Sequence, residues 1–362
     1  MLSPRETVWT LPTYHPPLAG REGLRLDFNE NTSGCSPRVL ERLRRIEPDD
    51  IAKYPERGPV ESEVADFLKI APEELLLTNG VDEGIHLLCE TFLEPGDEAL
   101  IVVPTYAMYR IYAKAAGAQV IGVRATNDFG FPAQQLRNRV TTRTRLVAIA
   151  NPNNPTGTVA SAEELIEIAD AAPDAAVLID EAYFEFCGQT MLGRWRERRN
   201  CFVARTFSKA YGMAGLRVGV LAGDAEQMRV VRRVASPYNV NAVALACLSE
   251  AIADQPYIDQ YVSEVLEGRG RLCSVLEENG IEFWPSQANF VLMRAGSSRA
   301  EAAQFVGEMR RRGILIRDRS SDESCEGCVR ISLGSRAHTD RLLAALQEAL
   351  QANRASQEAS RS

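Results

Sequence analysis

Short apolar runs alternate with longer amphipathic stretches over residues 50–223. Three of these runs, 99–103, 145–150 and 176–179, have the length of strands, and the stretches between such runs are long enough for helices. A chain in which strands and helices alternate forms a mostly parallel sheet that helices cover on both faces. The pattern therefore predicts an α/β fold for this part of the chain.

The pattern changes after residue 223, where three helices and then shorter elements are expected. The three helices are 224–234, 242–253 and 257–279. The shorter elements, in the order strand, helix, strand, strand and helix, are 289–294, 299–312, 314–317, 329–333 and 336–352. They predict a smaller α+β domain after the large one.

The length of the chain, 362 residues, also indicates two domains, because it exceeds what one typical hydrophobic core needs. We expect an N-terminal arm with part of the small domain at 1–46 and a large domain at 47–255. A small domain with an interdomain helix is expected at 256–350. The small, polar residues of 351–362 predict a flexible tail.

Composition and charge argue against several classes of protein. The chain has 41 basic and 49 acidic residues, which provides no electrostatic reason to bind nucleic acid or an anionic membrane. No apolar run approaches the length of a membrane span, and the first residues do not resemble a signal peptide. We therefore expect a cytoplasmic protein.

The eight cysteines are scattered along the chain. Cys325 and Cys328 form the only Cys-x-x-Cys pair, and a zinc site would need two more ligands. No second pair or neighbouring histidine supplies them, so no metal is expected.

Lys209 lies between two strand-like runs, 201–204 and 216–222, and is flanked by small residues and hydroxyls. A partly desolvated amine among cations can attack a carbonyl group. Thr206, Ser208 and Arg217 would suit a phosphate group beside it. A lysine next to a phosphate site suggests a Schiff base to pyridoxal phosphate (PLP), and the alternative is a structural turn.

An apolar strand upstream ends at Asp180. A buried carboxylate is usually paired, and the protonated pyridine nitrogen of PLP would be such a partner. Tyr183, three residues later, could place its hydroxyl on the ring oxygen of PLP. The alternative is that Asp180 caps the next turn.

Two further motifs follow the ends of predicted strands. Two Asn-Pro steps before Gly157 predict a tight turn, where Asn154 could bind the ring oxygen or the substrate. Tyr106 opens a helix after another strand and could stack on the pyridine ring. Tyr109 and Tyr112, at helical spacing, are expected in the core.

The segment 75–88 predicts a strand, a glycine turn and a helix. Free backbone amides at the start of a helix form an anion site, and those of Gly80, Val81 and Asp82 would face a phosphate. An ordinary helix N-terminus explains the same residues.

The order and spacing of these motifs resemble the fold-type I, PLP-dependent aminotransferases of class I and II, from about Leu26 to Leu346. Within that family the chain is most similar to the histidinol-phosphate aminotransferases. The matching motifs lie at 29–31, 53–55, 79–83, 154–157, 180–183, 208–217 and 329–332. The resemblance implies a homodimer with the type I transferase fold and a large, PLP-binding domain.

The resemblance also implies roles for residues around the cofactor. Lys209 would form the Schiff base and act as the base, Asp180 would pair with the pyridine nitrogen, and Tyr183 and Asn154 would bind the ring oxygen. Tyr106 would stack on the ring. The phosphate would be held by Val81, Asp82, Thr206, Ser208, Arg217 and, from the neighbouring subunit, Tyr54.

For the substrate, the resemblance implies that Arg330 binds an acidic group and that Arg317 is a second arginine for a phosphate. Tyr14 corresponds to a tyrosine that reaches into the partner's site, although residues 14–17 depart from the family pattern. Residues 27–34 depart as well, because they lack the usual proline after Asn-Glu-Asn.

The implied reaction is ping-pong amino transfer from histidinol phosphate to 2-oxoglutarate, in histidine biosynthesis. Two alternatives stay open, an aromatic amino acid aminotransferase and a PLP-dependent lyase similar to threonine-phosphate decarboxylases. A PLP-binding sensor that is not an enzyme has no support, because no DNA-binding domain precedes the fold.

Overall fold

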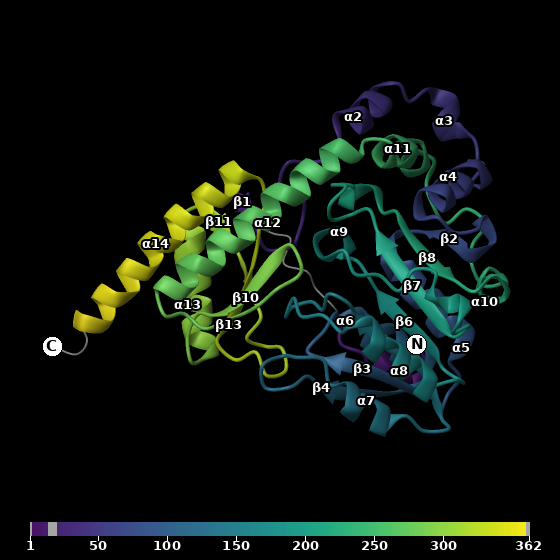
Figure 1. Ribbon diagram of the computed structural model, residues 1–362, viewed down its shortest axis with the longest axis horizontal. Helices are drawn as coiled ribbons and strands as arrows, with labels where there is room; N and C mark the ends of the chain where they lie inside the picture. The colour runs from purple at the N-terminus through teal and green to yellow at the C-terminus, as the bar shows by residue number, and fades with distance from the viewer. Residues whose placement is uncertain (1, 14–19, 360–362) are drawn as a thin grey trace.

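The computed structural model describes residues 2–13 and 20–359, with side chains up to residue 351 (Figure 1). Its largest sheet has seven strands in the order β2-β8-β7-β6-β5-β3-β4. In chain order these strands are β2 (Leu75–Thr78), β3 (Glu98–Val103), β4 (Gln119–Arg124), β5 (Thr144–Ala150), β6 (Ala176–Asp180), β7 (Cys201–Thr206) and β8 (Gly219–Gly223). Only β8 runs antiparallel to its neighbours, so the prediction of a mostly parallel sheet is confirmed.

Helices cover both faces of this sheet (Figure 1). Alternate strand residues enter two separate cores, as the two-residue period of a strand requires; Val177 belongs to one and Leu178 to the other. Helices α5 (Gly80–Phe92), α6 (Ala107–Ala116) and α10 (Ala225–Val231) pack on the Leu178 side. The Val177 side is covered by α4 (Gly58–Leu68), α7 (Ala133–Arg139), α8 (Ala162–Ala171) and α11 (Ala242–Ile252).

A smaller, four-stranded antiparallel sheet has the order β12-β13-β10-β9. Its strands are β9 (Phe283–Trp284), β10 (Phe290–Arg294), β12 (Arg317–Asp318) and β13 (Cys328–Ser332). Beside it lie α13 (Arg299–Arg311) and α14 (Arg336–Ala359). A separate parallel pair, β1 (Leu24–Arg25) with β11 (Ile314–Leu315), joins the N-terminal segment to this part of the molecule.

The long helix α12 (Gln255–Glu278) extends from the region of α11 to that of α14 (Figure 1). The remaining elements are short and connect the others. They are α1 (Glu6–Trp9), α2 (Pro37–Arg44), α3 (Pro48–Ala52), α9 (Phe184–Cys187) and the 3₁₀ turns η1 (Pro72–Glu74), η2 (Arg194–Arg196) and η3 (Ala214–Leu216). No helix of the described residues is long and apolar enough to cross a membrane.

Three expected elements differ from the structure. The predicted strand 216–222 begins only at Gly219, because the chain turns through η3 and a left-handed Arg217 at φ 55°. The predicted strand 314–317 is two strands, because Ile314–Leu315 pairs with β1 and Arg317–Asp318 pairs with β13. The last helix, expected to end at 352, continues to Ala359.

Candidate active site

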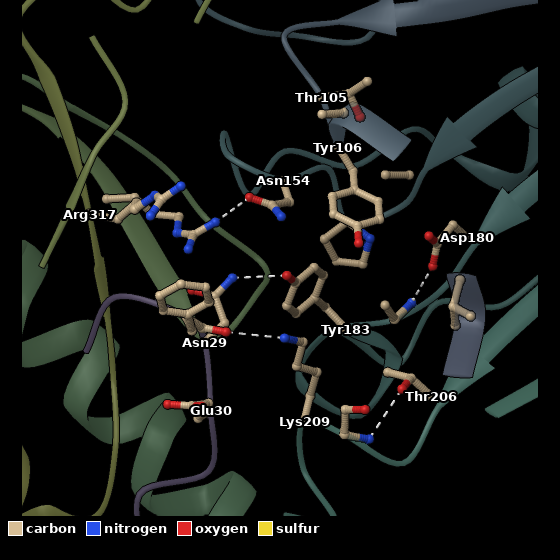
Figure 2. A pocket seen from close by; sticks show the side chains of 18 of the residues that line it. Asn29, Glu30, Thr105, Tyr106, Asn154, Asp180, Tyr183, Thr206, Lys209 and Arg317 are labelled. Carbon is tan, nitrogen blue, oxygen red and sulfur yellow. Dashed lines mark hydrogen bonds between the residues drawn. The ribbon is translucent and has the colours of Figure 1, made fainter. Parts of the chain in front are cut away.

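A cavity of about 440 Å³ lies between the carboxyl ends of the parallel strands and the edge of the small sheet. Figure 2 shows residues of both regions facing one another across it. Most of the residues predicted for a site line this cavity: Val81, Asp82, Tyr106, Asn154, Asp180, Tyr183, Thr206, Ser208, Lys209, Arg217, Arg317 and Arg330. Of the others, Gly80 lies immediately before Val81, Tyr54 is elsewhere, and Tyr14 is outside the described residues.

Lys209 follows β7 and is half-buried. Its Nζ donates a hydrogen bond to the carbonyl oxygen of Phe28, at 3.2 Å. Next to it, the amide of Ser208 donates to Oγ1 of Thr206 at 3.1 Å, which fixes the turn after the strand. The lysine amine is therefore held at the cavity wall, between the large sheet and the N-terminal segment.

Asp180 is the last residue of β6 and is buried. Its carboxylate accepts hydrogen bonds from the hydroxyl of Tyr109 at 2.5 Å and from the amide of Ala182 at 3.0 Å. Burial raises the pKa of Asp180 to about 6, although the bond from Tyr109 acts in the opposite direction. No lysine or arginine among the described residues forms an ion pair with it.

Tyr183 is oriented by a buried chain of side chains. Its hydroxyl accepts a hydrogen bond from Nδ2 of Asn29 at 2.8 Å, and Oδ1 of Asn29 accepts one from Ser332 at 2.7 Å. The Tyr183 ring also packs edge-on against Phe290, with ring centroids 5.1 Å apart. The tyrosine hydroxyl therefore has a fixed position, near Lys209 in Figure 2.

The start of α5 forms a tight cradle with Arg217. Gly80 has a left-handed φ of 70°, and a Cβ placed there would lie 2.4 Å from Nη2 of Arg217. The same guanidinium pairs with Asp82 at 3.1 Å, and Asp82 accepts a hydrogen bond from the hydroxyl of Tyr106 at 2.7 Å. Backbone amides at a helix start beside an arginine can hold a phosphate.

Two arginines face the cavity from the small sheet. Arg317 of β12 and Arg330 of β13 are directly paired across the ladder. Arg330 is buried; it donates to Oδ1 of Asn154 and, at 2.7 Å, to the carbonyl oxygen of Asp27. Burial lowers the pKa of Arg330 to about 9, and the nearby positive charges of Arg319 and Arg317 add to this effect.

The sequence matches the family "Aminotransferase class I and II" over residues 21–346. The chain belongs to this family. The class I/II resemblance drawn from the motifs is therefore confirmed, and so are the fold and the enzyme class that it implies.

Named relatives agree with this assignment. The histidinol-phosphate aminotransferase of Caldanaerobacter subterraneus is 34% identical over 331 residues, which cover 90% of this chain and 93% of the relative. That of Dehalococcoides mccartyi is 33% identical over 90% of each chain. The crystal structure of histidinol-phosphate aminotransferase from Sinorhizobium meliloti, in complex with pyridoxal 5′-phosphate, superimposes with a TM-score of 0.87 at 26% identity, over 96% of this chain and 97% of the other.

Tyr54 of this aminotransferase does not line the cavity of its own subunit, within the part of the chain that the structure describes. Its ring is 76% exposed and stacks on Tyr238, with centroids 4.1 Å apart. An exposed pair of aromatic rings is unusual for a surface that faces only water.

Among the pocket residues that were not predicted as site residues, Tyr109, Asn29 and Arg319 bear most directly on its chemistry. Tyr109 is buried, as expected, but its hydroxyl also donates a hydrogen bond to Asp180. The helical spacing of Tyr109 indicates that it is buried, but it does not indicate which residue its hydroxyl contacts. Asn29 lies in the Asn-Glu-Asn motif, which was used only to recognise the family. Arg319 lines the cavity beside Arg317, and no sequence signal distinguishes it from a surface arginine.

Proposed function

We propose that this aminotransferase uses PLP to transfer the amino group of histidinol phosphate to a 2-oxo acid, with 2-oxoglutarate as the natural acceptor in histidine biosynthesis. The relatives of matching length support the proposal, because they are named histidinol-phosphate aminotransferases. The observation that carries it is the position of Arg317 and Arg330, which face Lys209 and Asp180 across one cavity.

The shape and charge of the cavity suit PLP. Because residue 80 has no Cβ, the guanidinium of Arg217 can lie against the start of α5, where it and the backbone amides would hold a phosphate. Asp180 is a buried carboxylate that gains from a cationic partner, and a protonated pyridine nitrogen is such a partner. Thr206 and Ser208 would add hydroxyl groups to the phosphate site.

When bound, PLP supplies an aldehyde that captures the substrate amine and a ring that stabilises negative charge at the reacting carbon. Asp180 would keep the ring nitrogen protonated. Lys209 would hold the cofactor through its amine and carry the proton during the reaction. Tyr183, whose hydroxyl is positioned by Asn29, would donate to the ring oxygen together with Asn154, and Tyr106 would lie against the ring.

Arg330 serves both substrates in turn, because a guanidinium group binds either a carboxylate or a phosphate through two hydrogen bonds. A phosphate carries more charge and a third oxygen, so it gains more from a second cation. Arg317 lies directly beside Arg330 in the sheet and could be this second cation. Among the described residues it forms no ion pair with Asp318 or Asp322. Asp322 pairs with Arg319 instead.

The experiment compares the two half-reactions in single-arginine variants. Arg330→Ala is expected to slow both half-reactions, and Arg317→Ala is expected to slow mainly the half-reaction with histidinol phosphate. Each loss should correspond to roughly 2–5 kcal/mol of transition-state binding free energy. Arg294→Ala, which removes an arginine of the same sheet that pairs with Glu282, is the control. Equal losses for both substrates in Arg317→Ala would contradict a phosphorylated donor.

A panel of amino donors separates the alternatives. Turnover of phenylalanine in preference to histidinol phosphate would favour an aromatic amino acid aminotransferase. Carbon dioxide released from threonine phosphate would favour the lyase. The expected result is that the enzyme accepts both histidinol phosphate and glutamate as amino donors.

The assembly and location are part of the same proposal. A two-fold homodimer would bring the exposed Tyr54 of one subunit to the phosphate cradle of the other, with Tyr14 reaching toward the partner's substrate. The large domain, 47–255, would hold PLP, and the small domain, 256–350, would close over the substrate. An enzyme of amino acid biosynthesis would act in the cytoplasm.

A further inference from the structure

The loop 319–327, which joins β12 to β13, adds two charged residues to the cavity. Arg319 and Asp322 both line it, in the same region as Arg317 and Arg330. The proposed function leaves both of them without a role.

The guanidinium group of Arg319 is held in place by its own loop. The amide of Arg319 donates to the carbonyl oxygen of Cys328 at 3.0 Å, and the amide of Asp322 donates to the carbonyl oxygen of Arg319 at 2.9 Å. Across this turn the guanidinium forms an ion pair with the Asp322 carboxylate. The Arg319 side chain is only 15% exposed, so it is unlike a solvated surface arginine.

Both buried arginines keep an unused donor. The Nε atoms of Arg319 and Arg330 are buried and have no hydrogen-bond partner among the described residues. A buried donor without a partner is costly, and a bound anion would satisfy it. Unpaired Nε atoms also occur at Arg21, Arg137 and Arg312, so this feature alone does not identify a ligand site. At this end of the cavity, however, it coincides with a cluster of three arginines, and the two observations together favour an anionic ligand.

The local charge balance indicates what kind of anion. Arg317, Arg319 and Arg330 together with the single carboxylate of Asp322 leave a net charge of about +2. Burial raises the pKa of Asp322, while the three arginines act in the opposite direction, so all four groups share one electrostatic environment.

The neighbouring charges change this balance only in part. Arg21 and Arg25 are matched by Asp27 and Glu30. Asp318 also lines the cavity, and its carboxylate would lower the formal sum to about +1. Its side chain is exposed, however, so water screens its charge more than it screens the charges of the less exposed arginines. A phosphomonoester dianion brings about two negative charges to the cluster in one group, whereas a single carboxylate brings one. The two carboxylates of glutamate carry the same total charge, but on two separate groups.

We propose that Arg319, positioned by Asp322, is a third anion-binding arginine that selects a phosphomonoester dianion over a carboxylate. The inference rests on the proposed function, since it names the part of the pocket that would distinguish the phosphorylated donor from the dicarboxylic one. Asp322 is a positioning residue, because it acts on the ligand through Arg319.

The kinetic test uses the PLP-loaded enzyme and three amino donors: histidinol phosphate, histidinol, which lacks the phosphate, and glutamate. Arg319→Gln is expected to lower kcat/KM for histidinol phosphate roughly 10- to 100-fold. The values for histidinol and glutamate should change less than about threefold. Equal losses for all three donors, or no loss, would overturn the inference.

A matched control separates the charge from the stability of the loop. Arg124 forms an exposed ion pair with Glu323 of the same loop and does not line the cavity. Arg124→Gln should therefore leave unchanged the ratio of kcat/KM for histidinol phosphate to kcat/KM for histidinol. A ratio that falls equally in both variants would assign the effect to the loop and would refute a direct role for Arg319.

A binding measurement tests the inference without turnover. In the PLP-loaded enzyme the cradle would already be filled by the phosphate of the cofactor. Calorimetric titration with inorganic phosphate would therefore report only on sites outside the cradle. Wild type should bind phosphate more tightly as the pH rises through the second pKa of inorganic phosphate, where the dianion forms. Arg319→Gln should reduce the affinity roughly tenfold and weaken this pH dependence. Unchanged phosphate affinity in Arg319→Gln would contradict the inference.

Asp322→Asn tests the positioning role. If Asp322 acts only through Arg319, Asp322→Asn should lower kcat/KM for histidinol phosphate less than Arg319→Gln does. The double variant should then be no worse than Arg319→Gln alone. Additive losses would show that Asp322 acts independently, and this part of the inference would be wrong.

The two proposals can fail separately. If wild type does not accept histidinol phosphate, the proposed function is wrong, and the phosphate titration still decides whether Arg319 binds a dianion. If wild type accepts histidinol phosphate and Arg319→Gln does so equally well, the proposed function stands and the inference fails.

Discussion

Asp180 is a buried carboxylate whose hydrogen-bond donors are a tyrosine hydroxyl and a backbone amide. Both donors are neutral, and burial raises the pKa of Tyr109 as well, so the tyrosine stays protonated and keeps donating. The folded protein without cofactor therefore contains a carboxylate that is costly to ionise. Cofactor binding would remove this cost, which links the stability of the protein to the chemistry of the site.

This cost predicts a dependence of stability on pH. The pKa of Asp180 is about 6 in the folded protein and about 4 in an unfolded chain, so the folded state binds the proton more tightly. Stability from this residue is lost as the pH rises from about 4 to 6, by up to roughly 3 kcal/mol. Cofactor-free Asp180→Asn should therefore gain stability relative to wild type over this range in denaturant titrations.

A stability difference between the two proteins that stays constant with pH would contradict this prediction. As a control, saturating PLP should reduce the pH-dependent difference, because wild type would then have a cation beside its carboxylate.

The convergence of Lys209, Asp180 and Tyr183 on one cavity could be predicted from the sequence, while the residues that orient them could not. Lys209, Asp180 and Tyr183 each follow an apolar strand, and the ends of parallel strands converge at one edge of a sheet. Asn29 reaches Tyr183 from 154 positions away in the chain. Such a contact depends on how the N-terminal segment crosses the cavity, which local patterns do not encode.

Among the elements, the turn from β2 into α5 is the one on which the proposed phosphate site depends. The turn requires a left-handed backbone at Gly80 and close approach of the Arg217 side chain. A side chain at residue 80 would meet that guanidinium and would also strain the backbone.

Gly80→Ala should therefore weaken PLP binding by roughly tenfold or more and reduce stability by about 1 kcal/mol. Gly215→Ala is the matched control, because a Cβ at Gly215 meets no atom within 4 Å and its φ is not left-handed. The measurement is the dissociation constant of PLP, obtained by titrating cofactor-free protein. Similar constants for the two alanine variants would contradict the cradle.

Most strands and helices followed from the hydrophobic pattern, and the exceptions share a cause. The strand expected at 314–317 changes partner between Leu315 and Arg317, from β1 to β13. The strand expected at 216–222 begins late because Arg217 turns toward Asp82. In both cases tertiary contacts, and not local propensity, set the boundary of the strand.

At the scale of the whole molecule, the site is built by segments far apart in the chain. Arg330 of the small sheet bonds to the carbonyl oxygen of Asp27 and to Asn154 of the large domain. Lys209 bonds to the neighbouring Phe28. The N-terminal segment therefore lies between the two halves of the cavity and connects them.

The proposed dimer can be tested by mixing two inactive variants. Lys209→Ala should lose several orders of magnitude in turnover, and Tyr54→Ala should lose PLP affinity. In a hybrid dimer, the subunit with an intact Lys209 would receive the intact Tyr54 of its partner. Mixing equal amounts under exchange conditions should restore about a quarter of wild-type activity at limiting PLP.

Activity that stays at the level of the unmixed variants would show that Tyr54 does not act across subunits. Mixing two Lys209→Ala preparations is the control, and it should restore nothing.

Amino transfer from histidinol phosphate, the reaction proposed for this enzyme, can be followed in a single turnover. One equivalent of histidinol phosphate is added to the PLP-loaded enzyme, and the absorption spectrum of the cofactor is followed before and after 2-oxoglutarate is added. The aldehyde form of the cofactor should be replaced by its amino form, and 2-oxoglutarate should restore the aldehyde form as one equivalent of glutamate is produced. A cofactor spectrum that histidinol phosphate leaves unchanged, while phenylalanine converts it, would refute histidinol phosphate as the amino donor.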